Sequence, residues 1–275
     1  MGKIEPGLAG VPETLLWTLY HRATEARRPD AVLADPLAVE VVDAIDYPFA
    51  QRFGRDVAAR AQWQALRTRR FDDEIRRFLD RHSDGTVVAL GEGLETQFWR
   101  VDNGRVRWLG VDLPEVVRLR RRLLPAADRQ RSVACSVLDP AWLAEVDPSR
   151  GVVICAQGLL MYLDRADVHR VIGTCAERFP GATLVFDAVL HWFSQRTLRG
   201  AMTSGGYAAP PMPWGIDARE LETLRHLHPN IAQVRRLGLP RGRGVLFGYL
   251  MPALGALPRL RNLIPIWILR ARFRP

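Results

Sequence analysis

Two glycines and an aspartate mark the part of this 275-residue chain where residue types and spacing point most directly to chemistry. An apolar run over 86–90 ends at Gly91-Glu92-Gly93, and a second apolar run ends at Asp112, about 20 residues further on. Glycines allow a tight turn and a close approach of the backbone to a ligand. An acid at the end of the next strand can accept hydrogen bonds from both ribose hydroxyls. The stretch therefore predicts a βαβ nucleotide site.

The neighbouring strand ends narrow the class of ligand. Thr96 stands where a dinucleotide fingerprint has its third glycine, which favours S-adenosylmethionine over NAD. Ligands of doubly wound sheets lie outside the carboxyl ends of the strands. Ser136 and Val137 would then flank the adenine, and Gln157 would face the methionine part. A helix N-cap role for Asp112 and a solvated turn at Ser136 stay open as alternatives.

Hydrophobic periodicity predicts the elements that must position these residues. Residues 12–28 have helical spacing with Pro12 in the first turn, Asp35 is placed to cap a short helix, and 55–81 form one long helical pattern. Beyond residue 82 short apolar runs alternate with helical segments, which predicts a doubly wound, mostly parallel α/β sheet. The runs expected as strands are 86–90, 106–111, 131–137, 151–156, 182–187, 231–237 and 266–273.

The same patterns predict one domain with four regions. Residues 1–82 form a helical N-terminal cap, and residues 83–187 form the cofactor-binding core. Residues 188–230 include a Gly/Pro-rich interval long enough to act as a lid over the substrate. Residues 231–275 hold the last strands and a helical insert near 243–263.

The chain is basic, with a formal net charge of +9. Its arginines are spread along amphipathic helices, Lys3 is the single lysine, and no nucleic-acid-binding motif is present. We therefore expect no nucleic-acid partner, although a basic surface favours an acidic small substrate.

Composition also limits location and metal chemistry. No apolar stretch of the length that a membrane span needs is present, and the N-terminus lacks a leader pattern, so a cytoplasmic enzyme is expected. Cys135, Cys155 and Cys175 lack CxxC spacing and are expected as buried free thiols, two on strands and one on a helix. His226 and His228 have no third ligand nearby, so no metal site is predicted.

Eight segments, taken in order from residue 13 to about residue 190, carry a more specific signal than the glycine turn. On these segments the chain resembles the leucine carboxyl methyltransferase family, and within it the bacterial polyketide O-methyltransferases of the tetracenomycin type. The resemblance implies a class I methyltransferase fold with a seven-stranded sheet, S-adenosylmethionine as methyl donor and S-adenosylhomocysteine as product. The segments are ETLLWTLYHRA, DPLAVEVVDAIDY, ALRTRRFDDEIRRFL, LGEGLETQFWRV, VDLPEVVRLRRRLLP, SVLDPAWL, QGLLMYL and FPGATLVFDAV.

The resemblance also implies roles for matched positions. Arg67 would pair with the methionine carboxylate, because an arginine fork matches a carboxylate bidentately, and Arg69 and Arg70 compete for this role. The other matched positions are Gly91 beside the methionine backbone, Asp112 at the ribose, and Ser136 with Val137 at the adenine.

Two positions depart from the family pattern. Gln157 stands where the family usually has Glu, so it can accept from the methionine ammonium without charge, and weaker cofactor binding is expected. Ser136 stands where the phosphatase-methylating members have Asp, which matches the polyketide branch.

Tyr162 and His191 are the residues expected to hold the methyl acceptor, because both lie at or just after strand ends. Core packing of Tyr162 and a polar loop position for His191 are the alternatives. In-line displacement at a sulfonium methyl mainly requires alignment of donor and acceptor. A carboxylate acceptor would need no general base, whereas a phenol with a pKa near 10 would benefit from one.

These observations predict an S-adenosylmethionine-dependent O-methyltransferase. The acceptor would be a carboxylate or phenolic hydroxyl of a small, acidic or aromatic metabolite, either polyketide-like or another secondary metabolite. A methyltransferase of protein C-terminal carboxyl groups and a non-catalytic cofactor-binding module are alternatives. An NAD-dependent oxidoreductase would need a third glycine and a Tyr-Lys or Cys-His set, and the lone Lys3 excludes the Tyr-Lys set.

Overall fold

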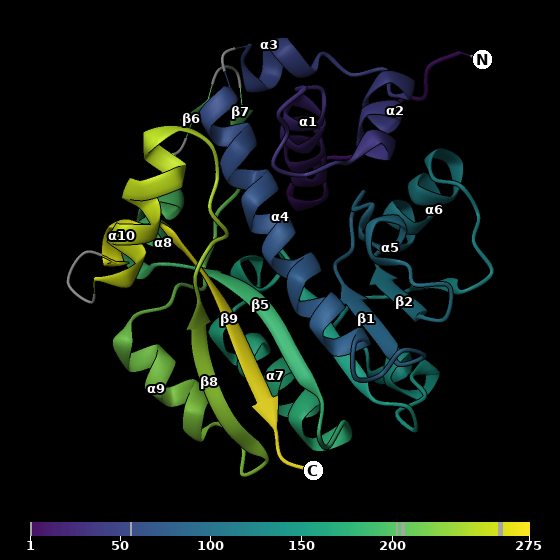
Figure 1. The fold of residues 1–275 in the computed structure, drawn as a ribbon, viewed down its shortest axis with the longest axis vertical. Helices are drawn as coiled ribbons and strands as arrows, with labels where there is room; N and C mark the ends of the chain where they lie inside the picture. The colour runs from purple at the N-terminus through teal and green to yellow at the C-terminus, as the bar shows by residue number, and fades with distance from the viewer. Residues whose placement is uncertain (1, 56, 202, 205–206, 258–260) are drawn as a thin grey trace.

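A seven-stranded sheet organises the molecule in the computed structural model, which describes residues 2–55, 57–201, 203–204, 207–257 and 261–275 (Figure 1). The last strand of the chain runs antiparallel to both of its neighbours, and the other pairs are parallel. The predicted mostly parallel α/β sheet is confirmed. Across the sheet the strands are β3 (Gln130–Ala134), β2 (Arg107–Asp112), β1 (Thr86–Leu90), β4 (Val152–Ala156), β5 (Thr183–Val189), β9 (Ile266–Phe273) and β8 (Ile231–Leu237).

The centre of the sheet determines where a ligand can bind. Every residue of β1 and β4 is buried, as continuous apolar runs in parallel strands require. The strand order reverses between these two strands, because β1 leads outward to β2 while β4 leads to β5 on the other side. Such a reversal opens a crevice at the carboxyl ends of the two strands. Gly91 follows β1 there and Gln157 follows β4.

Helices cover both faces of the sheet (Figure 1). One face packs against α4 (Ala58–Leu79) and α5 (Gln97–Val101), and the other against α7 (Arg165–Arg178) and α9 (Ala218–His226). The second half of α4 contributes Phe71, Ile75 and Phe78 to the core of the sheet. The long helix expected at 55–81 therefore belongs to the sheet layers as well as to the N-terminal region.

The N-terminal helices pack over the turn that follows β1. Leu15 of α1 (Thr14–Ala26) shares a hydrophobic cluster with Leu94 and with residues of α2 (Pro36–Ala44), α3 (Phe49–Phe53) and α6 (Pro114–Leu123). Asp35 caps α2 as predicted, because its Oδ1 accepts a hydrogen bond from the backbone N–H of Ala38 at 3.3 Å. The hydrophobic cluster around Leu15 and Leu94 holds the N-terminal helices as a roof above the crevice.

Several elements differ from the sequence-based expectation. Strand β3 ends at Ala134, so Cys135 follows the strand and is only half-buried, whereas Cys155 and Cys175 are buried as expected. Residues 140–145 form a 3₁₀ helix, which Asp139 caps by accepting a hydrogen bond from the N–H of Ala141 at 2.9 Å. The insert near 243–263 contains a π-helical turn (Leu246–Leu250), α10 (Met251–Ala256) and a 3₁₀ turn (Arg261–Leu263), and residues 258–260 lie outside the described part.

The region expected as a lid contains α8 (His191–Leu198), a short hairpin of β6 (Thr203–Ser204) and β7 (Tyr207–Ala208), and α9. Residues 202 and 205–206 of this region lie outside the described residues. Its role as a lid stays a prediction.

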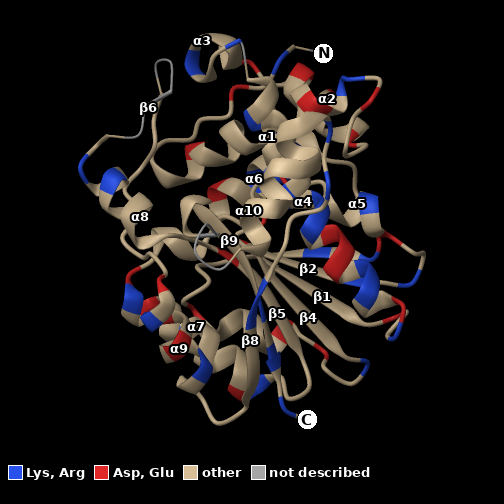
Figure 2. Ribbon diagram, turned by 60° about the vertical axis from the view of Figure 1, so that its left-hand side comes forward, with Lys and Arg blue, Asp and Glu red and all other residues tan. Residues whose placement is uncertain are grey.

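Basic and acidic residues are both spread along the chain, as the coloured ribbon of Figure 2 shows. Blue and red segments lie next to each other on the helices and turns, in agreement with the scattered arginines of the sequence. Within the described ranges, no helix is both long enough and apolar enough to cross a membrane.

Candidate active site

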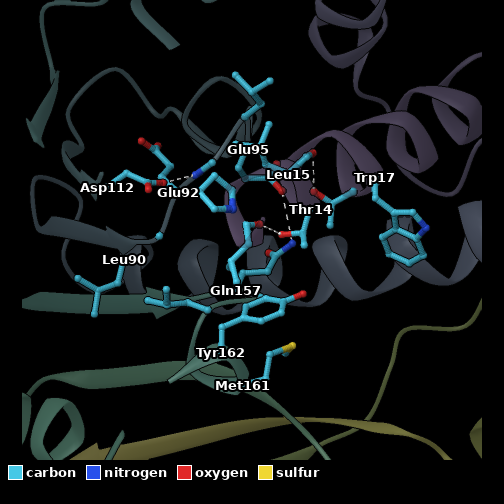
Figure 3. A pocket seen from close by; sticks show the side chains of 18 of the residues that line it. Thr14, Leu15, Trp17, Leu90, Glu92, Glu95, Asp112, Gln157, Met161 and Tyr162 are labelled. Carbon is cyan, nitrogen blue, oxygen red and sulfur yellow. Dashed lines mark hydrogen bonds between the residues drawn. The ribbon is translucent and has the colours of Figure 1, made fainter. Parts of the chain in front are cut away.

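A cavity of about 500 Å³ lies at the carboxyl ends of β1, β2 and β4, beneath the N-terminal helices. Figure 3 shows Asp112 and Glu92 at one end, Gln157 near the middle, and Tyr162 with Met161 below it. Segments far apart in the chain therefore meet at one site. The cavity brings together all the predicted cofactor-binding residues, namely Arg67, Gly91, Gly93, Asp112, Ser136, Val137 and Gln157.

The glycine turn has a backbone that other residues rarely adopt. Gly91 and Gly93 have φ values of 61° and 55°, in the left-handed region. A Cβ on Gly91 would lie 2.9 Å from Cδ1 of Leu159, and one on Gly93 would lie 3.2 Å from Cβ of Leu15. The two glycines therefore allow the turn to fit between the roof and the residues that follow β4.

Asp112 is linked directly to this turn. Its Oδ2 accepts a hydrogen bond from the backbone N–H of Gly93 at 2.6 Å, and its Oδ1 accepts from the N–H of Leu113 at 2.8 Å. Leu113, not Asp112, is the N-cap of α6. Burial raises the pKa of Asp112, and the two backbone N–H groups oppose this shift. Remaining lone pairs of the carboxylate can accept from ribose hydroxyls.

Glu92 lies beneath the turn in a buried network that the sequence did not reveal. It accepts a hydrogen bond from Nε1 of Trp108 at 2.6 Å and lies 3.0 Å from Nη2 of Arg120. A Cβ on Gly110 would lie 2.2 Å from Oε2 of Glu92, so the glycine makes room for the carboxyl group. Arg120 in turn donates to the carbonyl oxygen of Gly93 at 2.6 Å. The network thus supports the glycine turn from below.

Glu92→Gln is expected to remove a pH dependence of stability. Burial raises the pKa of Glu92 from 4.5 to about 7 in the folded protein. The stabilisation from its protonated form is therefore complete below about pH 4.5 and is lost as the pH rises through 7, at a cost of about 3 kcal/mol. Urea unfolding of wild type and variant at about pH 5 and about pH 8 measures this difference. The exposed Glu145→Gln is the control, and equal pH dependence in wild type and Glu92→Gln would contradict the assignment.

Gln157 occupies the middle of the cavity. Its Nε2 donates to Oγ1 of Thr68 at 3.1 Å and to Oε2 of Glu95 at 3.4 Å. Its Oε1 is buried and has no hydrogen-bond partner among the described residues. Glu95 also pairs with Arg22 at 2.9 Å and with Arg100 at 2.8 Å. An unpartnered acceptor in a cavity can accept a hydrogen bond from a ligand, above all from a positively charged donor such as an ammonium group.

Of the three candidate arginines, Arg67, Arg69 and Arg70, only Arg67 lines the cavity. Its side chain is buried and lines the cavity, whereas Arg69 is exposed and Arg70 pairs with Glu74 at 3.0 Å. Nε of Arg67 donates to Oδ2 of Asp187, which is fully buried at the end of β5. Arg67 thus reaches the cavity with its charge already balanced by Asp187, and its contact with a methionine carboxylate stays a prediction.

The far end of the cavity is apolar and carries two tyrosines. Burial raises the pKa of Tyr162 to about 12, although a hydrogen bond with Thr14 opposes this shift. Tyr207 is only 7% exposed, and its hydroxyl has no partner among the described residues. The apolar residues that line this end include Met161, Phe193, Met212 and Ile266.

His191 lies outside the cavity. It is exposed at the start of α8, where its backbone N–H donates to the carbonyl oxygen of Ile216 at 3.0 Å. His191 is the first residue of α8 and is not among the residues that line the cavity. The structure therefore does not bring His191 together with Tyr162. Its predicted contact with the methyl acceptor stays a prediction. In the described part of the chain, no group of three or more His, Cys, Asp or Glu residues could hold a metal ion.

Sequence reasoning missed Glu95 and Tyr207. Glu95 follows the glycine turn by two residues, and an acid so close to a predicted ligand turn could have been noted. Tyr207 comes from the Gly/Pro-rich interval, where no periodicity predicts which side chains turn inward.

Comparisons with known proteins agree with this geometry. A model of the leucine carboxyl methyltransferase family matches residues 16–176. The chain is 37% identical over 220 residues to the tetracenomycin polyketide synthesis O-methyltransferase TcmP of Streptomyces glaucescens, covering 78% of this chain and 79% of that protein. It is 31% identical over 245 residues to the S-adenosyl-L-methionine-dependent methyltransferase dpfgK of Gibberella zeae, with coverages of 78% and 79%.

Among solved structures, the CurJ carbon methyltransferase aligns over 96% of this chain and 68% of its own, with a TM-score of 0.54 and 13% identity. At this identity the likeness shows the shared fold alone. Because the family model spans more than half of the chain, the chain belongs to the leucine carboxyl methyltransferase family of S-adenosylmethionine-dependent methyltransferases.

Proposed function

We propose that this protein transfers a methyl group from S-adenosylmethionine to a carboxylate or phenolic oxygen of a small apolar or aromatic metabolite. The observation that carries the proposal is the division of one cavity into a polar end with Asp112 and Gln157 and an apolar end with Tyr162 and Tyr207. The similarity to TcmP, a polyketide O-methyltransferase by name, supports the class of acceptor.

The residues at the polar end of the cavity have the chemistry needed to hold the cofactor. Gly91 and Gly93 line the cavity with no side chain of their own, and a Cβ on either would press against Leu159 or Leu15. The backbone of the turn can therefore approach a ligand, and Asp112 can accept hydrogen bonds from a ribose. The buried, unpartnered Oε1 of Gln157 can accept from an ammonium group. Ser136 and Val137 line the same cavity and would flank the adenine. The bound cofactor supplies a methyl group on a sulfonium, which is already activated for displacement.

The residues at the apolar end would align and desolvate the acceptor. Tyr162 keeps its proton at neutral pH, because its pKa is about 12, so it can donate a hydrogen bond but cannot serve as a general base. The hydroxyl of Tyr207 has no partner among the described residues and would donate a hydrogen bond to an acceptor oxygen. Neither tyrosine removes a proton, so this end suits a carboxylate, which is ionised at neutral pH, better than a phenol.

Incubation with a labelled methyl donor tests the proposal. We expect label in aryl carboxylates or phenols and none in proteins of a whole-cell lysate, read by mass spectrometry as a gain of one methylene. With a carboxylate acceptor the rate should be flat from about pH 6 to about pH 9, whereas with a phenol it should rise toward the phenol pKa of about 10. Tyr207→Phe should raise the KM for the acceptor without changing the affinity for S-adenosylhomocysteine. Label found only in protein would overturn the proposal.

A further inference from the structure

The methionine part of the cofactor carries an ammonium group, and the cavity must balance its charge. Three acids line the cavity among the described residues: Glu92, Glu95 and Asp112. Asp112 is bound to the glycine turn at the ribose end, and Glu92 is bound by Trp108 beneath the turn. Glu95 is the remaining acid, and it accepts a hydrogen bond from Nε2 of Gln157, whose Oε1 has no partner among the described residues.

Glu95 determines which end of the Gln157 amide faces the cavity. An ionised carboxylate can only accept hydrogen bonds, so the Nε2 side of the amide must face Glu95. The structure has this arrangement, with Nε2 3.4 Å from Oε2 of Glu95 and 3.1 Å from Oγ1 of Thr68. The amide oxygen is thereby left as a buried acceptor without a partner. A glutamine held in this way presents partial negative charge to a cation.

Glu95 itself belongs to a buried cluster with an excess of negative charge. Arg22 and Arg100 contact three carboxylates, those of Asp35, Asp72 and Glu95, at distances of 2.8 to 3.2 Å. Two guanidinium groups and three carboxylates leave one net negative charge in a region of low dielectric, where charges act strongly. Arg76 also pairs with Asp72, at 4.0 Å, but its side chain is 46% exposed, so solvent screens its charge and it offsets the excess only in part.

We propose that Glu95 supplies the negative charge that holds the cofactor's ammonium group, and that it acts by orienting Gln157, whose amide oxygen accepts from that group. Glu95 is thus a positioning residue for the methyl donor. The two arginines keep it ionised despite its burial, because they lower its pKa. The inference rests on the cofactor assignment within the proposed function.

Calorimetric binding of two ligands tests the inference. One is S-adenosylhomocysteine, and the other is its desamino analogue, in which hydrogen replaces the amino group. We expect Glu95→Gln to weaken binding of S-adenosylhomocysteine by about 10- to 100-fold, the range for a hydrogen bond to a charged group, and to change binding of the analogue by about twofold at most. The Glu95→Gln variant should fold, because both arginines retain ion-pair partners. Arg22 still pairs with Asp35, and Arg100 still pairs with Asp35 and Asp72.

Two further variants make the test independent of that one substitution. Gln157→Leu removes the amide oxygen and leaves Glu95, and it should show the same selective loss. The exchange Glu95→Gln with Gln157→Glu moves the negative charge by one side chain and should regain most of the wild-type affinity for S-adenosylhomocysteine. Glu92→Gln is the matched control, because its carboxyl group lines the same cavity but contacts Trp108 and Arg120, and it should affect both ligands equally.

The outcomes distinguish a failure of the role of Glu95 from a failure of the cofactor assignment. Equal losses for both ligands in Glu95→Gln and Gln157→Leu, or no recovery in the exchange variant, would overturn the role of Glu95. A wild-type protein that binds neither ligand would overturn the proposed function as well.

Discussion

Asp112→Ala is expected to lower the affinity for S-adenosylhomocysteine by about 100-fold or more. Each hydrogen bond to a charged group contributes about 1.5–3 kcal/mol, and the carboxylate can accept from two ribose hydroxyls. The same side chain accepts from the backbone N–H of Gly93 at 2.6 Å, so its removal also releases the glycine turn. Both losses act on the bound cofactor.

Isothermal titration calorimetry measures this change directly. Asp43→Ala is a suitable control, because Asp43 is 65% exposed and pairs with Arg27 on the surface of the N-terminal helices. Asp112→Asn should fall between wild type and Asp112→Ala, since an amide oxygen can accept one of the hydrogen bonds. Wild-type affinity in Asp112→Ala would show that the ribose binds elsewhere.

Asp187→Ala is expected to have the largest effect on stability, a loss of about 3–5 kcal/mol in the free energy of unfolding. Asp187 is fully buried and accepts from Nε of Arg67 and, at 2.7 Å, from the backbone N–H of Gly158. Its removal leaves the buried guanidinium of Arg67 without its carboxylate partner. Urea unfolding should show a lower midpoint, and the Tm should fall by about 10 °C.

A double variant separates the buried charge from the packing. Arg67→Met with Asp187→Leu removes both charges and keeps much of the volume, so it should be less destabilised than Asp187→Ala alone. Asp167→Ala removes a carboxylate that pairs with Arg170 on the surface, and it should change stability by less than about 1 kcal/mol. A double variant as unstable as Asp187→Ala would mean that lost packing or the Gly158 hydrogen bond dominates.

Much of the fold could be predicted because its signals are local. The buried strands β1 and β4 are continuous apolar runs. Pro12 lies in a 3₁₀ turn that leads into α1, and Asp35 caps α2, which begins at Pro36. The predicted end of a strand was wrong where the neighbouring strand ends first. Strand β3 ends at Ala134, opposite Asp112, which is the last residue of β2, and a 3₁₀ helix follows at residues 140–145.

The sequence by itself determined the glycine turn, Asp112, and the alternation of strands and helices that places both at a strand end. These depend on backbone conformation and on contacts close in the chain, which residue type and spacing control. Only the tertiary structure decided that Arg67 reaches the cavity, that His191 does not, and that Tyr207 and Glu95 face the ligand region. Those side chains come from helices and loops far apart in sequence, and their directions follow from how α1, α4 and the segment after β5 pack around the strand ends.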